Sequence, residues 1–408
     1  MTESNLPPKN FYGIGREALY PQEQLLDIKK NNKRFSIGIP KENHNVETRI
    51  PLTPQGIGLL VDNGHEVYIE SGAGNAANFK DTDFSEVGAF ITENRSEVFT
   101  KDIVIKVTLP TEEEIGMMKE RGILFSTLNL LGMDITMVKK IMDKKLTAIA
   151  LDLLMDENGA FPIVRSLSEI EGNLSITLAS QHLSTIHGGK GVLLGGVTGI
   201  SPTEVVILGA GTAGTFAAKT ALGMGAVVKV FDYSIAKLRE LEHNLGQRVF
   251  TSNLHPSVLS KSLKSADVVI GTLRFLYGSR RFMVTEELIR LMKPGTVIVD
   301  LSVDQGGCFE TSKCTTLKNP MFEDHGVKHI CLPVMSVLVP RTASIAFSNI
   351  ITPILLEMGE RGGIMEHIKS DNGFCNGVYI YQGILTNHYI GQLYNIPSKD
   401  IGLLLAAF

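Results

Sequence analysis

The stretch that decides the fold runs from Glu204 to Leu222 and reads EVVILGAGTAGTFAAKTAL. Its first five residues predict an apolar strand, and the residues after Gly214 have the composition of a helix. Between them, glycines stand at 209, 211 and 214. In this pattern the first glycine permits a tight turn, the second lets the backbone approach a pyrophosphate, and the third lets the helix lie close to the strand. The stretch therefore predicts a Rossmann-type phosphate turn.

A dinucleotide is the ligand that such a turn predicts, because its pyrophosphate would lie on the positive end of the helix that begins with Thr212 and Ala213. Asp232 follows the next apolar run. A carboxylate there can accept hydrogen bonds from the ribose hydroxyls and repels a 2′-phosphate, which favours NAD over NADP. Lys237 lies near enough in sequence to weaken that repulsion, so NADP remains an alternative. A glycine-rich turn that binds nothing is the other alternative.

Composition narrows the class of protein. The chain has 408 residues, of which 43% are hydrophobic and 20% charged, and its net charge is −4. These values are typical of a globular chain of two or three domains and give no electrostatic footprint for nucleic acid or an anionic membrane. No signal peptide and no apolar stretch of about 18 residues is present, which favours a cytoplasmic location. The four cysteines fit no disulfide framework or zinc pattern, so we expect reduced thiols and no metal.

The remainder of the chain predicts two α/β units. Apolar, β-branched runs recur at 36–40, 66–70, 103–107, 123–126 and 148–151, and again at 205–208, 228–231, 268–270, 297–299 and 329–331. Helical patterns separate most of these runs, which predicts parallel sheets covered by helices on both faces. Residues 1–34 are interpreted as an N-terminal extension with one short helix.

The chain resembles the alanine dehydrogenase and transhydrogenase N-terminal-domain family over nearly everything after residue 35. The motifs that carry the resemblance are IGIPKE, ETRIPLTP, HGGKGVLLGG, ILGAGTAG and DLSVDQGGC, at 37–42, 47–54, 187–196, 207–214 and 300–308. The last of them and the Gly-Gly-Lys-Gly stretch are more similar to alanine dehydrogenase than to transhydrogenase.

The resemblance implies two doubly wound, Rossmann-like domains with a cleft between them. Residues 35–162 and 341–408 would form a discontinuous substrate domain, and residues 163–340 would form the NAD-binding domain. It also implies NAD-dependent oxidative deamination of a small L-amino acid, alanine to pyruvate and ammonia, or the reverse reaction. The expected partners are the amino acid or 2-oxo acid and further copies of the chain in a homohexamer, with no nucleic acid and no membrane.

Three residues match positions that the family uses at its site. Arg49 matches the arginine that binds the substrate carboxylate, a role that suits its planar, bidentate guanidinium. Asp304 matches a carboxylate that orients the nicotinamide ribose or the reacting amine and water. Ser168 matches a serine near the cofactor. The alternatives are an arginine paired with Glu42 or Glu47, a turn-forming aspartate and an ordinary helix serine.

Other matched positions depart from the family. Thr108 replaces a lysine that helps to hold the substrate, and Asn129 replaces the catalytic histidine. Val334 stands where the family has asparagine, and Asp152 where it has glutamate. Because asparagine does not titrate near neutrality, it can only position groups where histidine would transfer protons. Two further hypotheses follow, namely a related dehydrogenase or imine reductase with another substrate, and a catalytically silent NAD(H)-binding protein.

The remaining histidines do not supply the missing imidazole. His182 and His187 are expected to be structural or surface residues. The same expectation holds for His44, although its place in the loop of Arg49 makes it the first of the three to test.

Overall fold

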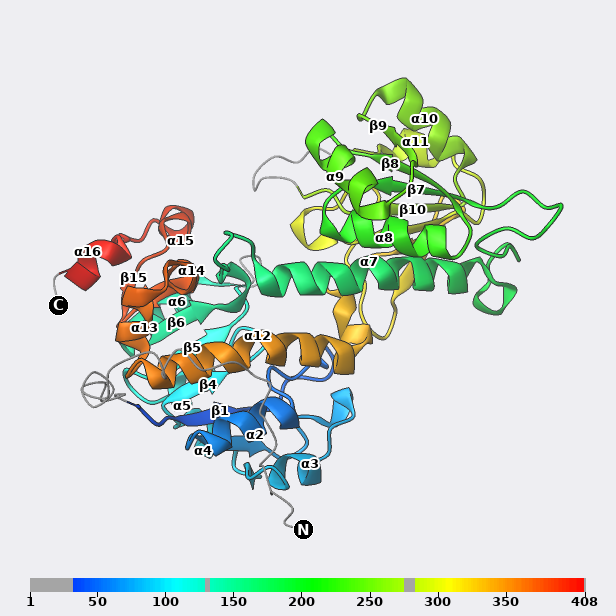
Figure 1. Cartoon of the computed structure of the whole chain (residues 1–408). Coiled ribbons are helices and arrows are strands. Elements are labelled where there is room, and N and C mark those ends of the chain that lie inside the picture. The colour runs from blue at the N-terminus through cyan, green and yellow to red at the C-terminus, as the bar shows by residue number, and fades with distance from the viewer. Residues whose placement is uncertain (1–31, 129–132, 275–282, 407–408) are drawn as a thin grey trace, which may run out of the picture.

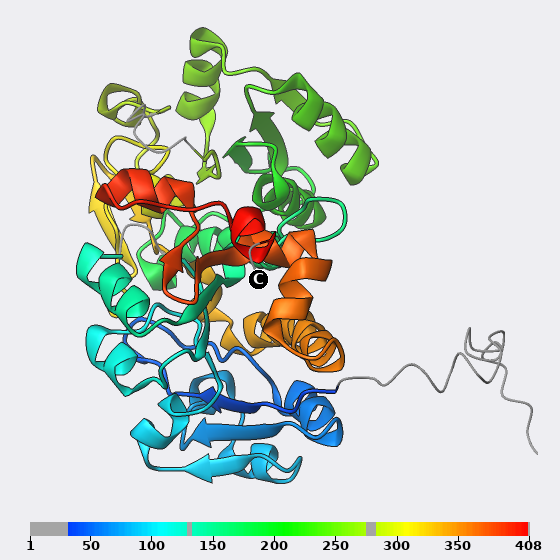
Figure 2. The ribbon, with the colours of Figure 1, turned by 90° about the vertical axis from the view of Figure 1, so that its left-hand side faces the viewer.

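The structure is a computed structural model, and it describes residues 32–128, 133–274 and 283–406 (Figure 1). Asn129 and the short helix expected within residues 1–34 lie outside the described residues. Two sheets organise the described part of the chain, and each is flanked by helices. Seen from the side, the blue and cyan strands of one sheet lie at the opposite end of the molecule from the green elements of the other (Figure 2).

The first sheet has the strand order β15-β14-β6-β5-β4-β1-β2-β3. Its strands are β1 (Ser36–Ile39), β2 (Glu66–Glu70), β3 (Phe90–Thr92), β4 (Ile103–Ile105), β5 (Ile123–Ser126), β6 (Thr147–Ala150), β14 (Val378–Tyr381) and β15 (Ile384–Leu385). The first six strands pair in parallel, and β14 and β15 add an antiparallel edge. The C-terminal part of the chain thus completes a sheet that its N-terminal part begins.

The second sheet has the order β12-β13-β11-β10-β7-β8-β9. Its strands are β7 (Glu204–Leu208), β8 (Val227–Phe231), β9 (Phe250–Ser252), β10 (Val268–Gly271), β11 (Val297–Asp300), β12 (Met321–Asp324) and β13 (Val327–Ile330). All of them pair in parallel except β12, which is antiparallel to β13. Read from β9, the parallel strands follow the 3-2-1-4-5-6 order of a Rossmann fold.

The first six strands of the first sheet follow the same order, so the predicted pair of doubly wound domains is confirmed. In such sheets a ligand binds beyond the carboxyl ends of the strands, at the switch point where the order reverses. The first-sheet switch point lies between β1 and β4, and the second-sheet switch point between β7 and β10. The loops after these four strands are therefore where a site is expected.

Helices cover both faces of each sheet. Around the first sheet lie α2 (Pro54–Asp62), α3 (Asp81–Ser85), α4 (Arg95–Phe99), α5 (Glu112–Met117), α6 (Ile135–Asp143), α13 (Ile364–Ser370), α14 (Asn372–Gly377), α15 (His388–Tyr394) and α16 (Ile401–Ala406). Around the second lie α8 (Thr212–Gly223), α9 (Ile235–Leu245), α10 (Pro256–Ser265) and α11 (Glu286–Ile289). Short 3-10 turns, η2 to η6, span Asn75–Ala77, Leu151–Leu153, Thr185–His187, Val303–Gln305 and Met335–Leu338.

Two long helices connect the sheets, and each begins with a proline at its first turn. These are α7 (Pro162–Leu183) and α12 (Pro340–Glu360). Proline suits this position because the first helical N–H groups have no partner within the helix. Helix α7 packs against α8 of the second sheet and also contacts α12, which packs on α2 of the first (Figure 1).

Side chains of the strands form the hydrophobic cores on both faces of each sheet. Ile37 and Ile105 point into a cluster on one face of the first sheet, and Val104 and Leu124 point into another on the opposite face. The second sheet likewise has a separate cluster on each face. Among the described residues one helix, α12, is long and apolar enough, by length and composition, to cross a membrane. Half of its apolar 18-residue segment is buried inside the molecule.

Candidate functional site

A cavity of ≈ 660 Å³ opens at the second-sheet switch point. Most of the residues that the sequence predicts as cofactor-binding line it, namely Ser168, Gly209, Gly211, Thr212, Ala213, Asp232 and Lys237. They come from α7, from the turn between β7 and α8 with the first turn of α8, and from the loop after β8 with the first turn of α9. The cavity also extends along the loop after β10, where Thr272, Leu273 and Arg274 lie.

Steric limits shape the glycine turn at Gly209 and Gly214. Gly209 has φ +115, and a Cβ there would lie 2.3 Å from the hydroxyl of Thr272. A Cβ at Gly214 would lie 1.9 Å from the carbonyl oxygen of Gly209, so α8 can approach β7 this closely only with glycine. At Gly211 a Cβ would meet nothing within 4 Å, and this residue lines the cavity. The backbone of the turn therefore lines the cavity without a side chain at Gly211 to cover it.

The first turn of α8 faces this cavity without a side-chain cap. Gly211 is the N-cap residue and provides no side-chain acceptor, while Thr212 and Ala213 line the cavity. Gly172 of α7 allows the two helices to meet here, since a Cβ on it would lie 2.3 Å from the carbonyl oxygen of Ala213. Uncapped N–H groups at a helix N-terminus favour an anion.

Asp232 begins the loop after β8 and is only 4% exposed. One carboxylate oxygen accepts a hydrogen bond from the backbone N–H of Ala210 at 2.7 Å, and the other accepts from that of Ser234 at 2.8 Å. Asp232 thus braces the phosphate turn against the start of α9. It also lines the cavity, where its remaining lone pairs can accept hydrogen bonds from hydroxyl groups.

At the first-sheet switch point, Arg49 is buried in an ion pair. Its Nε and Nη2 donate to the two carboxylate oxygens of Glu47 at 2.7 and 2.6 Å, and its guanidinium lies 5.2 Å from the ring centroid of Phe347. Burial by itself would lower the pKa of Arg49, but the charge of Glu47 and its hydrogen bonds outweigh this and raise the pKa. Arg49 therefore remains charged, and its partner is buried as well.

A serine and a glutamate join Arg49 to the nucleotide-side cavity. Nη1 of Arg49 donates to Oγ of Ser336 at 3.0 Å, and this hydroxyl donates to Oε1 of Glu171 at 3.0 Å. Ser336 lies in η6 and Glu171 on α7, where it lines the cavity. Burial raises the pKa of Glu171, while Ser336 and Arg49 lower it. A continuous chain of polar contacts thus connects the two sheets.

Thr108 follows β4, and its hydroxyl is engaged by a carboxylate. It donates to Oε2 of Glu42 at 2.6 Å, while Oε1 of Glu42 accepts from the backbone N–H of Val107 at 2.7 Å. Lys106 lies 3.6 Å from Glu42 but is held by Glu114 at 2.8 Å and is buried. Burial raises the pKa of Glu42, against the opposing effect of Lys106. This loop therefore offers no unpaired cation to the first-sheet switch point.

Asp304 lies in η5, directly after β11. Its charge raises the pKa of Glu171, so the two carboxylates lie within electrostatic reach of one another. Burial raises the pKa of Asp304 itself, and Arg274 lowers it. The structure thus brings Asp304, Glu171 and Arg49 to one region between the sheets. Val334, which the sequence flags as a departure, lies beside η6 and is 37% exposed.

Sequence reasoning missed Glu171, Ser336 and Arg274 as functional candidates. Glu171 stands three residues after Ser168, so the two share one face of α7, and this spacing is the signal that could have identified it. Ser336 and Arg274 carry no such local pattern.

The three flagged histidines lie away from the cavity lining. His44 is exposed, and His182 and His187 contact each other near the end of α7, with ring centroids 5.2 Å apart. Burial lowers the pKa of His182. The four cysteines, all within the described residues, form no disulfide in this structure.

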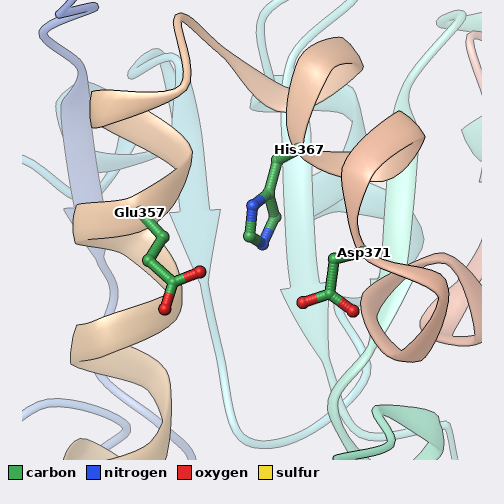
Figure 3. A group of neighbouring side chains, drawn as sticks. All are labelled: Glu357, His367 and Asp371. Carbon is green, nitrogen blue, oxygen red and sulfur yellow. The ribbon is translucent and has the colours of Figure 1, made fainter. Parts of the chain in front are cut away.

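Among the residues described, one group of three side chains has ligand atoms close enough to hold a metal ion. Glu357, His367 and Asp371 have ligand atoms within 4.8 Å of one another, and Figure 3 shows the imidazole between the two carboxylates. Both carboxylates already have partners, because Glu357 pairs with Arg361 at 3.1 Å and Asp371 caps α14 through the N–H of Phe374. The group belongs to helices of the first sheet and is not part of the cavity lining.

Family models match both parts of the chain. The model of the family "Alanine dehydrogenase/PNT, N-terminal domain" matches residues 38–171, and that of "Alanine dehydrogenase/PNT, C-terminal domain" matches residues 175–388. A curated alanine dehydrogenase of Staphylococcus epidermidis is 38% identical over 90% of this chain and 99% of that protein. Alanine dehydrogenase 2 of Staphylococcus aureus is 36% identical over 90% of this chain and 98% of that protein.

Solved structures agree with the fold. An L-alanine dehydrogenase superposes with a TM-score of 0.82 at 35% identity, covering 88% of this chain and 99% of that one. A transhydrogenase from Sinorhizobium meliloti shares the fold with a TM-score of 0.73 at 22% identity, covering 86% of this chain and 98% of that one. The two switch points, the motifs around them and these matches together show that the chain belongs to the alanine dehydrogenase/PNT family.

Proposed function

We propose that the chain is an NAD-dependent oxidoreductase that oxidatively deaminates a small L-amino acid, with alanine as the first candidate, or runs the reverse reaction. The observation that carries this proposal is the link from Arg49 through Ser336 to Glu171, because Glu171 lines the nucleotide-side cavity. Arg49, whose guanidinium suits a substrate carboxylate, is thereby linked to the wall of a cavity that suits a dinucleotide.

The cavity at the second-sheet switch point would hold NAD. The uncapped N–H groups of α8 suit its pyrophosphate, and Asp232 suits a ribose diol. Lys237 also lines the cavity, which keeps NADP as an alternative. When bound, the nicotinamide supplies the hydride acceptor, and the residues of the chain position the substrate against it.

The substrate would lie between the two switch points. Arg49 would bind its carboxylate through the two N–H groups that the contacts with Glu47 and Ser336 leave over, since a guanidinium has five. Asp304 and Ser168 would orient the reacting groups at the cavity. Thr108 and Asn129 would position polar groups by hydrogen bonding and could not transfer protons near neutral pH.

In this proposal the two sheets correspond to two domains. Residues 35–162 with 341–408 form the substrate domain and residues 163–340 the NAD-binding domain, a division supported by the pairing of β14 with β6. We further propose a cytoplasmic homo-oligomer, a hexamer by family resemblance, which light scattering of the purified protein would test.

A second candidate is a related dehydrogenase or imine reductase with a different substrate. It is favoured by the charges at the first-sheet switch point, where Glu42 and Glu47 are buried and Lys106 is neutralised by Glu114. Fewer available cations reduce the attraction for a simple carboxylate and favour a substrate that carries a positive group beyond the α-ammonium that alanine already has.

The test is a panel of L-amino acids and 2-oxo acids with ammonia, each with NAD(H) and NADP(H), followed by nicotinamide absorbance. Highest turnover with alanine or pyruvate and NAD(H) supports the first proposal. Higher turnover with another substrate selects the second candidate. Tight NADH binding without turnover of any substrate, in either direction, contradicts both and leaves a silent NAD(H)-binding protein.

A further inference from the structure

Glu171 presents one held and one accessible carboxylate oxygen at the cavity. It stands one turn after Ser168 on the same face of α7, and both residues line the cavity. Oε1 accepts hydrogen bonds from the backbone N–H and the hydroxyl of Ser336, at 3.2 and 3.0 Å. Oε2 accepts none from residues 32–128, 133–274 and 283–406, yet it is not a buried atom. Ser336 thus fixes the side chain, and Oε2 remains accessible to a ligand.

The contacts of Arg49 show that Glu171 is not needed to balance its charge. Both carboxylate oxygens of Glu47 already accept hydrogen bonds from Nε and Nη2 of Arg49. Nη1 reaches Glu171 only through Ser336, by two consecutive contacts of 3.0 Å each. Nη1 of Arg49 and Oε1 of Glu171 therefore lie no further apart than twice that distance.

This spacing suits an α-amino acid, whose carboxylate and ammonium groups are attached to the same carbon. A substrate whose carboxylate is held by the two remaining N–H groups of Arg49 can turn its ammonium toward Oε2 of Glu171. Such a hydrogen bond is strong because both partners are charged. The other described carboxylates that line the cavity are Asp232 and Glu240, and no hydrogen bond between described residues links either of them to Arg49.

The charges around Glu171 permit proton exchange. Burial raises its pKa above the ordinary value of 4.5, the hydrogen bonds that it accepts and the charge of Arg49 oppose this, and Asp304 raises it further. Arg274 after β10 and Arg165 on α7 also line the cavity. The elements packed against α7, namely α8, α12, β11, η3, η4 and η6, contribute no charged residue to the described lining. No described histidine lines the cavity, so a carboxylate is the available base there.

Resting on the function proposed above, we propose that Glu171 is a catalytic residue that binds the substrate ammonium and takes a proton from it. In this step an N–H bond of the ammonium breaks and an O–H bond forms at Oε2, while the electron pair stays on nitrogen. That pair forms the C=N bond as the hydride on the α-carbon passes to NAD⁺. Water then adds to the iminium carbon, an ammonium ion leaves to give the 2-oxo acid, and Glu171 releases its proton to solvent.

The first test is the pH dependence of kcat/KM with the best substrate of the panel. The wild type should show a rise in activity whose midpoint lies above pH 4.5, because Glu171 must be ionised to accept the proton. Glu171→Gln should lower kcat by roughly 10²–10⁴-fold, the usual loss on removing a general base, and should abolish the rise. Glu171→Asp should keep part of the activity together with the rise. Glu169→Gln is the matched control and should change neither, because Glu169 pairs with Arg165 on the same helix and does not line the cavity.

Ser336 is tested by the position of the same rise. Its hydroxyl lowers the pKa of Glu171, so Ser336→Ala should move the midpoint to higher pH. A Glu171 that only holds η6 in place through Ser336 would give a profile of altered amplitude with an unmoved midpoint, which would contradict the proposal.

The second test needs no turnover and compares two ligands that differ in one group. The substrate that the panel selects is paired with its 2-hydroxy analogue, which for L-alanine is L-lactate. Binding of each to the protein saturated with NADH is followed by NADH fluorescence, which also shows that each variant is folded. Glu171→Gln should weaken binding of the amino acid by roughly 10- to 100-fold, as expected for a hydrogen bond between charged groups, and should change binding of the hydroxy acid little.

The outcomes separate this role from the proposed function. A wild type that turns over no substrate overturns the proposed function and the proton transfer with it. An active wild type whose rise persists in Glu171→Gln overturns the role of Glu171 alone, and loss of the rise in Asp304→Asn would then assign the proton transfer to Asp304. Equal weakening of both ligands in Glu171→Gln would show that Glu171 does not contact the ammonium and would overturn the proposal as well.

Discussion

The two switch points share one topology but differ in the groups that they present. At the second-sheet switch point, backbone geometry builds the site: three glycines and an uncapped helix end surround a cavity. At the first-sheet switch point, charged side chains build it, and most of them are already paired with one another. A backbone site is fixed by a short, local pattern, whereas a side-chain site can be altered one residue at a time. Cofactor binding and substrate choice can therefore diverge separately within one fold.

The largest expected effect comes from restoring the family's residues at the first-sheet switch point. The double replacement Thr108→Lys with Asn129→His returns a cation and a titratable imidazole. If alanine is a poor substrate of the natural chain, alanine turnover should rise by roughly 10²–10⁴-fold, as expected for gain of a general acid–base group. Steady-state kinetics with alanine and NAD would measure it. A decrease from an already high alanine turnover would show that the natural residues are fully competent.

The next largest effect concerns the buried pair of Arg49 and Glu47. Arg49→Ala leaves the carboxylate of Glu47 buried without its partner, which should cost about 3–5 kcal/mol in the free energy of unfolding. Replacing both residues, Arg49→Met with Glu47→Gln, should cost less because no unpaired charge remains. Chemical denaturation of the three proteins measures the comparison. Equal losses in the single and double variants would contradict a tightly coupled pair.

A smaller effect is expected at the phosphate turn. Gly214→Ala places a Cβ 1.9 Å from the carbonyl oxygen of Gly209, so the helix must move away from the strand. We expect a loss of about 1–3 kcal/mol in the free energy of unfolding, as for overpacking, together with weaker NADH binding. Gly223→Ala on the same helix is the control, because a Cβ there meets nothing within 4 Å. If both variants bind NADH alike, the close approach at Gly214 does not shape the site.

The smallest effect concerns the link between the two regions. Ser336→Ala removes the hydroxyl that joins Arg49 to Glu171 and should cost about 0.5–1.5 kcal/mol in stability, the usual contribution of a hydrogen bond. Because Glu171 lines the cavity, the affinity for NADH should change as well. Isothermal titration of both proteins with NADH measures it. Unchanged NADH affinity would show that the link is structural only.

The sequence predicts the parts of the molecule that are local. The phosphate turn occupies six consecutive residues, and the two series of buried strands follow from short apolar runs. The antiparallel edges escaped prediction: β12 reads MFED, with charged residues, and β14 follows directly on a helical stretch. β12 is an edge strand, supported on one side only, so its sequence carries a weaker pattern. β14 pairs with both β6 and β15, and the helix that directly precedes it in the sequence hides it.

The candidate site was predictable only in part, because its residues come from distant parts of the sequence. Arg49 and Asp304 lie within family motifs and could be named from sequence. Ser336 and Glu171 meet across 165 positions of the chain, and Arg49 meets Ser336 across 287. No spacing rule connects residues so far apart, because the fold alone brings them together. The effect of the Arg274 charge on the pKa of Asp152 likewise joins residues that lie far apart in the sequence.

The hydroxyl of Ser336 has a thermodynamic consequence for how strongly the two ligands bind. A substrate carboxylate that draws Arg49 toward itself would compete with the contact to Ser336, and the change would pass to Glu171 on the wall of the other cavity. Two ligands connected in this way alter each other's affinity by the same factor, whichever binds first. We therefore expect the dissociation constant of the dinucleotide to depend on substrate concentration, with the coupling reduced when this single oxygen atom is removed.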